Sequence, residues 1–179
     1  MARIPYPDAS RYEREPLVER IERERGGKLL NLYKMLLHSP PVAEGWLAFF
    51  TAIRQSAQLP GRYRELAILR IAVLNDADYE FNAHAPIALA EGVAQAVIDD
   101  LRAGRLPPAL EAADCAVLAY ADSMTRGVRV PDDIFAQVRE HLSEREVVEL
   151  TATIAAYNCV SRFLEALHVD QEQEDGSAA

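Results

Sequence analysis

RYRELAILRIAVLNDADYEFNAHAPIALAEGV, which spans residues 62–93, is the stretch that decides the fold. Its first part, residues 62–75, is apolar on most sides, which predicts a helix at the centre of the core. Asn75 and Asp76 predict a short turn, and a second helix is expected over 79–91, closed by Gly92. The stretch therefore predicts two consecutive helices, of which the first is the more deeply buried.

Helical periodicity extends outward from this pair in both directions. Further helices are expected at 16–25, 29–38, 41–58, 94–103, 110–126, 131–141 and 143–168. Ser39-Pro40-Pro41 and Leu59-Pro60-Gly61 separate neighbouring helices, and Ser143 and Glu146 have the spacing of a capping box. No segment shows sustained alternation of apolar and polar residues with β-branched enrichment. The pattern predicts an all-α fold.

The helix at 41–58 and the helices after it lead to expectations about which apolar faces are buried. The helix at 41–58 is expected to bury Val42, Trp46, Phe49, Phe50 and Ile53. From this helix onward, alanine is frequent and polar residues are few on more than one face. Because symmetric self-association is the common way to cover such faces, we expect a homo-oligomer, from a dimer to a hexamer.

The length of 179 residues suits a single domain that can bury a sizeable core. Residues 1–28 are expected to form an N-terminal arm and a short helix, and residues 29–168 the helical domain. The acidic stretch 169–179 is expected to be a disordered tail.

Net charge and hydropathy narrow the range of partners and compartments. The net charge of −9 argues against a nucleic-acid partner, which would favour a basic face. No apolar run approaches the roughly 20 residues that span a bilayer, so no membrane partner is expected. The N-terminus lacks the apolar core of a secretory signal, which favours a cytoplasmic protein. In that compartment, Cys115 and Cys159 are expected to be reduced thiols buried in the core.

His84 is the histidine whose surroundings suggest chemistry. Glu80 precedes it by four residues, so the two side chains share one face of a helix. Pro86 follows it, and a proline inside a helix removes one backbone hydrogen bond and favours a kink beside the histidine. A carboxylate that holds an imidazole is a general acid–base unit. A surface Glu–His pair of little energetic consequence is the alternative explanation of the same spacing.

Glu65 is the third candidate, because it lies near the start of the mostly apolar helix at 62–75. A carboxylate buried on such a helix needs a partner. An exposed Glu65 would simply be favoured by the helix dipole. His38, His141 and His168 all lie at expected helix ends, where a structural role suffices. The candidate catalytic residues are therefore Glu65, Glu80 and His84.

The run RELAILRIAVLNDADYEFNAHAPIALAEGV resembles the carboxymuconolactone decarboxylase family, which includes the alkylhydroperoxidase AhpD-like proteins. The resemblance covers roughly 29–168, and Tyr157-Asn158-x-x-x-Arg162-Phe163 is similar to the closing helix of the family. It implies an AhpD-like helical bundle. AhpD-like members carry a Glu, a C-x-x-C motif twelve positions later and a His four residues after the second Cys. These positions correspond to Glu65, Ala77, Glu80 and His84, so both redox cysteines are absent.

The decarboxylase branch of the family has a Glu four residues before a His, which Glu80 and His84 match. That branch decarboxylates a γ-lactone acid by proton transfer and needs no cofactor. The resemblance thus implies a cofactor-independent lyase or isomerase acting on a small organic acid or lactone. His84 would be the general acid–base, Glu80 would orient it, and Glu65 would be a second acid or polarising group.

The sequence leaves open which residues bind the substrate and whether the function is a different one. Phe49, Phe50, Tyr79 and Phe81 are expected to line the substrate pocket, and Arg64, Arg70 or Arg162 to bind an anionic group. Three other functions remain possible. One is a thiol peroxidase that uses Cys115 or Cys159, and another is a metal site formed by Glu65, Glu80 and His84. The third is a non-catalytic oligomeric binding protein.

Overall fold

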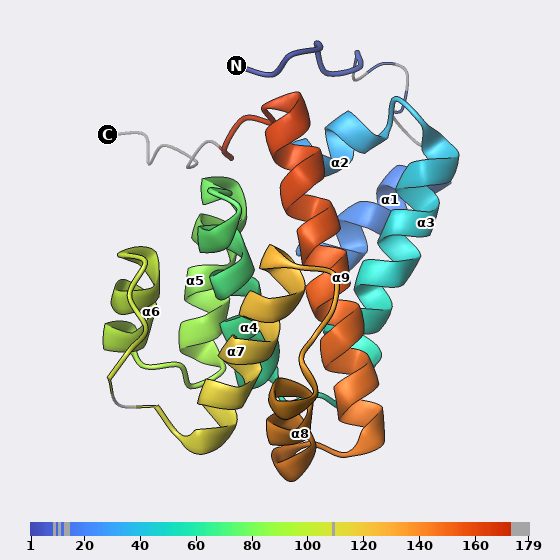
Figure 1. Ribbon diagram of the computed structural model, residues 1–179. Helices are drawn as coiled ribbons and strands as arrows, with labels where there is room; N and C mark the ends of the chain where they lie inside the picture. Colours follow the sequence, from blue (N-terminus) through green and yellow to red (C-terminus); the bar gives the residue numbers. More distant parts are fainter. Residues whose placement is uncertain (9, 11, 13–14, 109, 173–179) are drawn as a thin grey trace. The chain divides into compact units, whose positions relative to one another are not determined.

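Helices account for all the regular secondary structure in the described part of the chain, which comprises residues 1–8, 10, 12, 15–108 and 110–172 of this computed structural model (Figure 1). No strand occurs in those ranges, so the all-α prediction is confirmed. The helices are α1 (Pro16–Glu24), α2 (Asn31–Leu36), α3 (Pro40–Thr51), the π-helical turn η2 (Ala52–Ser56), α4 (Gly61–Leu74), α5 (Asp78–Ala90), α6 (Gln95–Arg102), α7 (Ala112–Arg126), α8 (Asp132–His141) and α9 (Glu144–Leu167). Among the described residues, none of these helices has the length and apolar character needed to cross a membrane.

Backbone contacts divide the chain into two compact units. The larger unit, residues 56–163, contains α4 to α8 and most of α9. The smaller unit contains residues 1–55 and the chain from Leu164 onward. This division by contacts does not test the domain boundaries expected from the sequence, which stay a prediction.

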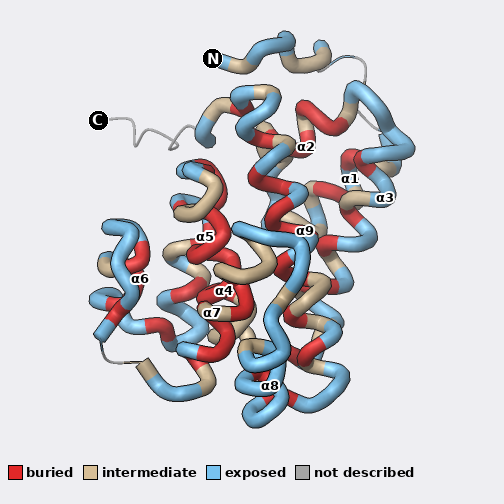
Figure 2. The backbone as a smooth tube through the Cα atoms, viewed as in Figure 1, coloured by how far each residue is buried: buried red, intermediate tan, exposed pale blue. Residues whose placement is uncertain are grey.

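Helix α4 is the centre of the larger unit, as the sequence predicts. It packs against α5, α6 and α7, and all eight residues from Glu65 to Ala72 are buried (Figure 2). A helix that is apolar on most sides must be covered on most sides, which explains why its neighbours surround it. Its polar residues Glu65 and Arg70 therefore lie inside the core, whereas Arg62 and Arg64 are partly exposed.

The residues expected to begin and end the helices lie at the observed helix ends. Pro60 precedes the first residue of α4, and Gly92, with φ of 84°, follows the last turn of α5. At α9, the backbone N–H of Ser143 donates to Glu146 at 2.8 Å, and the N–H of Glu146 donates to the Ser143 hydroxyl at 3.3 Å. The capping box is therefore confirmed. Helix α5 continues through Pro86.

The N-terminal arm lies against the C-terminal segment within the smaller unit. The N–H of Arg3 donates to the carbonyl of Leu167 at 2.9 Å, and the Tyr6 hydroxyl contacts Asp170 at 3.1 Å. The N–H of Asn31 donates to Glu172 at 2.7 Å. Residues 169–172 of the expected disordered tail are thus hydrogen-bonded, and its remaining residues, 173–179, lie outside the described part of the chain.

Four residues that were expected to be buried are exposed. Val42 and Phe49 are 50% and 48% exposed on α3, whereas Phe50 and Ile53 are buried as expected. Helix α3 buries Ala43, Leu47 and Phe50, so the expected stripe is correct at Phe50 and wrong at Val42 and Phe49. Cys115 and Cys159 are both exposed rather than buried. They lie on the outward faces of α7 and α9, whose apolar neighbours in sequence face inward.

The outward face of α3 predicts self-association. Val42, Trp46 and Phe49 follow one another at helical spacing, and water contact with such a stripe is unfavourable. We therefore propose a homo-oligomer that uses this face. Sedimentation at micromolar concentration should give at least a dimer, and Phe49→Lys should lower the mass toward that of the monomer. Val128→Lys, at an exposed site between α7 and α8, is the control. A wild-type monomer would contradict the proposal.

Candidate active site

Helices α4 and α5 bring the three predicted residues together in the core of the larger unit. Glu65 lies in the second turn of α4, Glu80 in the first turn of α5 and His84 one turn further along α5. Their exposures are 1% for Glu65, 4% for Glu80 and 4% for His84. The three side chains meet because α4 and α5 are packed against each other. The alternative of a solvated surface Glu–His pair is therefore excluded.

The shortest contact in this group joins Glu65 to His84. The Glu65 Oε2 atom lies 2.6 Å from His84 Nδ1, and both side chains are buried. An ionised carboxylate only accepts hydrogen bonds, so the bond requires a proton on Nδ1. A charge-assisted bond of this length also fixes the orientation of the ring. The geometry therefore assigns the proton of the neutral imidazole to Nδ1 and the lone pair to Nε2.

Arg64 binds the other oxygen of the same carboxylate. Its Nε donates to Glu65 Oε1 at 2.9 Å, and its Nη2 donates to Glu91 at 3.2 Å. A side chain at Gly61 would collide with the Glu91 carboxylate, so glycine leaves the space in which Glu91 meets Arg64. Burial raises the pKa of Glu65, but hydrogen bonds and charges from His84 and Arg64 outweigh it, and the pKa is lowered overall. Glu65 is consequently ionised at neutral pH.

Glu80 lies on the opposite side of the imidazole ring. Its Oε2 atom is 3.5 Å from His84 Nε2, as the four-residue spacing on one helix face predicts. The distance is longer than a normal hydrogen bond to a ring nitrogen. Glu80 therefore faces Nε2, whereas the shorter contact with the ring is the one that Glu65 makes with Nδ1.

Tyr157 of α9 is a member of the site that was not singled out from the sequence. Its ring lies edge-on to His84, with 5.0 Å between centroids and an interplanar angle of 90°. It is buried, as is the adjacent Asn158, which accepts a hydrogen bond from Asn75 at 3.1 Å. The signal that could have indicated Tyr157 was the resemblance of its stretch to the closing helix of a family. A single sequence does not indicate which α9 side chain faces α5.

The arginines expected to bind an anion all have protein partners. Arg64 binds Glu65 and Glu91, and Arg70 binds both oxygens of Asp122. Arg162 donates to the side chain of Asn158 at 2.9 Å. Of the expected pocket aromatics, Phe50, Tyr79 and Phe81 are buried, and the Arg102 guanidinium lies 4.2 Å from the centroid of the Phe81 ring.

Thiol and metal chemistry receive little support from the geometry. Cys115 lines a cavity formed by α7, α8 and the segment that precedes α7, and that cavity includes none of the three site residues. Within the described ranges, no group of three His, Cys, Asp or Glu side chains is arranged to hold a metal ion.

Part of the chain matches a known protein family. The sequence profile of the carboxymuconolactone decarboxylase family matches residues 40–123, which include Glu65, Glu80 and His84. No curated protein sequence matches the chain.

Solved structures share the fold over most of the chain. An Agrobacterium tumefaciens protein, suggested to be the antioxidant-defence protein AhpD, is 24% identical, with a TM-score of 0.71 over 78% of this chain and 96% of that chain. A peroxidase-related protein with an alkylhydroperoxidase AhpD core, from Ralstonia eutropha JMP134, is 18% identical, with a TM-score of 0.79 over 96% and 93%. A variant of the debrominase Bmp8 bound to 2,3,4-tribromopyrrole is 18% identical, with a TM-score of 0.78 over 96% and 94%.

The profile match covers α3 to α7, and the structural matches extend the likeness to nearly the whole chain. Ala77 and Glu80 occupy the positions at which AhpD-like proteins carry the two cysteines of their C-x-x-C motif. Residues 40–123 therefore match the carboxymuconolactone decarboxylase family, the fold is that of AhpD-like structures, and the sequence has no C-x-x-C motif.

Proposed function

We propose that the protein is a cofactor-independent lyase or isomerase that moves a proton on a small organic acid or lactone, with His84 as the residue that transfers it. The observation that carries the proposal is the 2.6 Å hydrogen bond between Glu65 and His84 Nδ1 inside the core. The decarboxylase branch of the superfamily gives the substrate class, because Glu80 and His84 match its Glu-x-x-x-His spacing.

Glu65 sets up His84 for this chemistry. With Nδ1 protonated and bound to an ionised carboxylate, Nε2 carries the lone pair and is the basic atom. When Nε2 takes up a proton, the resulting imidazolium lies between two carboxylates, because Glu80 is 3.5 Å from Nε2. Their charges stabilise the imidazolium, which then serves as the acid in the second half of the reaction.

Two reactions fit this arrangement with balanced atoms and charges. In an isomerisation, Nε2 removes a proton from a carbon next to the lactone carbonyl, and the imidazolium returns that proton to another carbon of the conjugated system. In a decarboxylation, the bond to the carboxylate breaks, carbon dioxide leaves, and the electron pair stays on carbon as an enolate. For this reaction His84 must first take up a solvent proton at Nε2, and the imidazolium then gives that proton to the carbon and returns to the neutral state. Neither reaction consumes an oxidant or a reductant.

Stability alone gives a weak reason to retain these charges. Burying an ion pair costs desolvation, and replacing such a pair by apolar residues of similar volume is often neutral or stabilising. Glu65 and His84 are nevertheless buried in the core of the larger unit. Buried ionisable groups in fixed geometry are characteristic of catalytic sites, which supports a chemical role for the pair.

A thiol peroxidase is less consistent with the site. Its nucleophile is a thiolate, and AhpD-like proteins place that thiol four residues before the His, where this chain has Glu80. The similarity to peroxidase-related structures is a similarity of fold at 18–24% identity. It does not replace the missing sulfur.

His84→Gln tests the proposal directly, because glutamine retains polarity but cannot accept a proton at neutral pH. Carboxymuconolactone and related γ-lactone acids serve as probes in deuterium oxide, and proton NMR measures turnover and deuterium uptake at carbon. The variant should lose about 10²–10⁴-fold in rate, the usual contribution of an acid–base group. His141→Gln, at an exposed position of α8, should keep the full rate. Equal rates in wild type and His84→Gln would sink the proposal.

The ionisation of Glu65 has a consequence for stability. Its pKa in the folded protein lies below the ordinary value of 4.5, so the ionised form stabilises the fold above that pH. This contribution is lost as the pH falls through the lowered folded value. Glu65→Gln should therefore reduce the unfolding free energy by about 2 kcal/mol at neutral pH, and by less in acid. Urea titrations across this range measure the difference.

Glu144→Gln is the matched control for that experiment, since Glu144 is an exposed carboxylate in the first turn of α9. It should change the unfolding free energy by no more than about 0.5 kcal/mol at any pH. A deficit in Glu65→Gln that stays constant or grows as the pH falls would show that Glu65 is not held ionised in the folded protein.

A further inference from the structure

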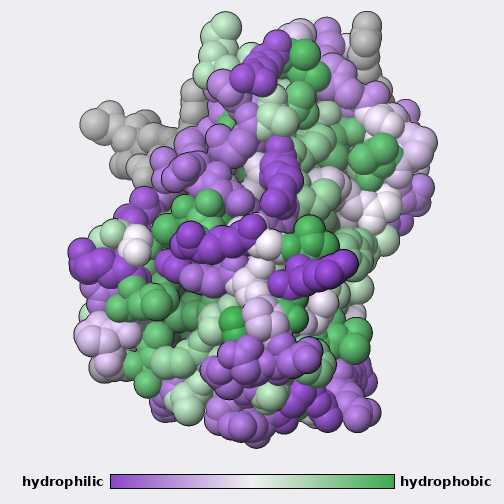
Figure 3. Space-filling model, in the orientation of Figure 1, coloured by the Kyte–Doolittle hydropathy of each residue, from purple (hydrophilic) through white to green (hydrophobic). Residues whose placement is uncertain are grey.

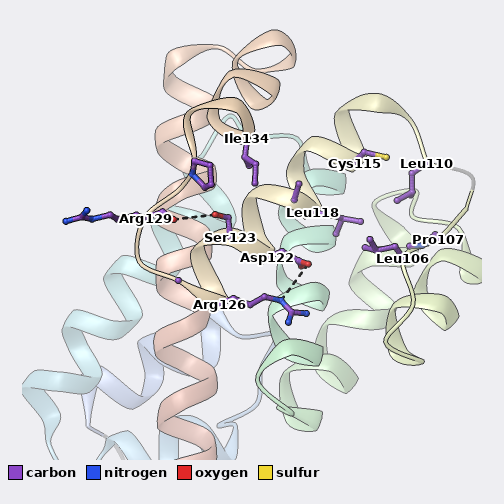
Figure 4. A pocket seen from close by; sticks show the side chains of 13 residues that line it. Leu106, Pro107, Leu110, Cys115, Leu118, Asp122, Ser123, Arg126, Arg129 and Ile134 are labelled. Carbon is purple, nitrogen blue, oxygen red and sulfur yellow. Dashed lines mark hydrogen bonds and ion pairs between the residues drawn. The ribbon is translucent and has the colours of Figure 1, made fainter.

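A cavity in the larger unit is lined by none of Glu65, Glu80 and His84. It has a volume of about 620 Å³, which is within the range of small-molecule sites. Helix α7 forms one wall, and the start of α8 and the segment before α7 form the others (Figure 4). Its apolar lining comes from Leu106, Pro107, Leu110, Leu118, Pro131 and Ile134. Figure 3 shows hydrophobic side chains gathered on the surface over α6 and α7.

The charged side chains at this cavity, one carboxylate and two guanidinium groups, carry a net positive charge. Asp122 lines it and is bound by both Nε and Nη2 of Arg70, which is buried on α4. Arg126, one turn after Asp122 on α7, lies 3.9 Å from the same carboxylate and is 66% exposed. Two guanidinium groups therefore face one carboxylate. Since Arg70 already satisfies Asp122, the charge of Arg126 is available to a ligand.

The other arginine of the lining does not compete for this role. Arg129 reaches the cavity with its backbone, whose carbonyl lies 3.5 Å from the Ser123 hydroxyl, while its side chain points away (Figure 4). Arg126 is thus the basic group at the mouth of an otherwise apolar pocket. An apolar body with one anionic group would complement both features.

We propose that this cavity binds an amphipathic organic monoanion, such as a medium-chain or aryl carboxylate. The apolar part lies against Leu110, Leu118 and Ile134, and the carboxylate pairs with Arg126. The proposal does not depend on the reaction at His84, because no residue is shared between the two sites. It assigns the cavity to a small molecule rather than to a second copy of the chain.

Cys115 provides a direct readout of occupancy. It is exposed and lines the cavity, whereas Cys159 is exposed on α9 and does not line it. In a Cys159→Ser background, Cys115 is the remaining thiol, so its rate of alkylation by a maleimide reports access to the cavity. Decanoate below its micelle concentration is the probe, and decanol, with the same chain length and no charge, is the neutral comparison.

Decanoate should slow Cys115 alkylation in a saturable way, with a dissociation constant about tenfold or more below that of decanol, since a charge-assisted contact separates the two. Arg126→Gln should weaken decanoate binding about tenfold and leave decanol binding unchanged. Arg129→Gln should change neither, because that side chain points away from the cavity. Ala119→Phe, which fills the cavity without altering its charge, should abolish protection by both ligands.

Three results would overturn the assignment. The first is equal protection by decanoate and decanol, which would remove the role of the charge. The second is an equal effect of Arg126→Gln and Arg129→Gln, which would indicate general electrostatic attraction. The third is alkylation that slows with rising protein concentration in the absence of ligand, which would show that a second copy of the chain covers the cavity.

Discussion

The buried carboxylate of Glu65 is the group on which the site depends. It is placed in the core by the central helix α4, where an unpaired charge would be strongly unfavourable. Its two oxygens are bound by two different donors, His84 Nδ1 at 2.6 Å and Arg64 Nε at 2.9 Å. Because the carboxylate stays ionised, the proton of the imidazole is held on Nδ1, and Nε2 is left facing Glu80. One pairing thus determines the orientation and the basic atom of His84.

The same helix uses its arginines to fix the elements around it. Arg62 binds the buried carboxylate of Asp114 on α7 at 2.6 Å and donates to the carbonyl of Gly92 at 2.6 Å. Arg64 reaches Glu91 beside that glycine, and Arg70 reaches Asp122, further along α7. These contacts tie the C-terminal end of α5 and two positions of α7 to α4. They also help to hold Glu65 of α4 in register with His84 of α5.

Much of this arrangement could be predicted from the sequence, and the failures have physical causes. The helices, the central position of α4 and the capping box at Ser143 follow from periodicity and spacing. Spacing, and the need of a buried carboxylate for a polar partner, made Glu65, Glu80 and His84 the candidates. The exposed faces of α3 and the cysteines were misjudged, because an apolar residue among apolar neighbours does not reveal which face turns inward. The Glu80–His84 contact expected from the spacing is present at 3.5 Å, but the shorter bond from Glu65 could not be predicted, since Glu65 reaches His84 only through tertiary packing. Tyr157 and the Arg70–Asp122 pair were missed for the same reason.

The position of the imidazole proton tests the central claim most directly. Protein labelled with nitrogen-15 at histidine allows NMR to determine which ring nitrogen of His84 carries a proton, through its one-bond coupling and chemical shift. The account predicts a slowly exchanging proton on Nδ1, shifted downfield by the bond to Glu65, and loss of that downfield signal in Glu65→Ala. A His84 ring that is protonated on Nε2 and bare at Nδ1 at neutral pH would contradict the account, because Glu65 could then neither orient the imidazole nor leave Nε2 as the basic atom.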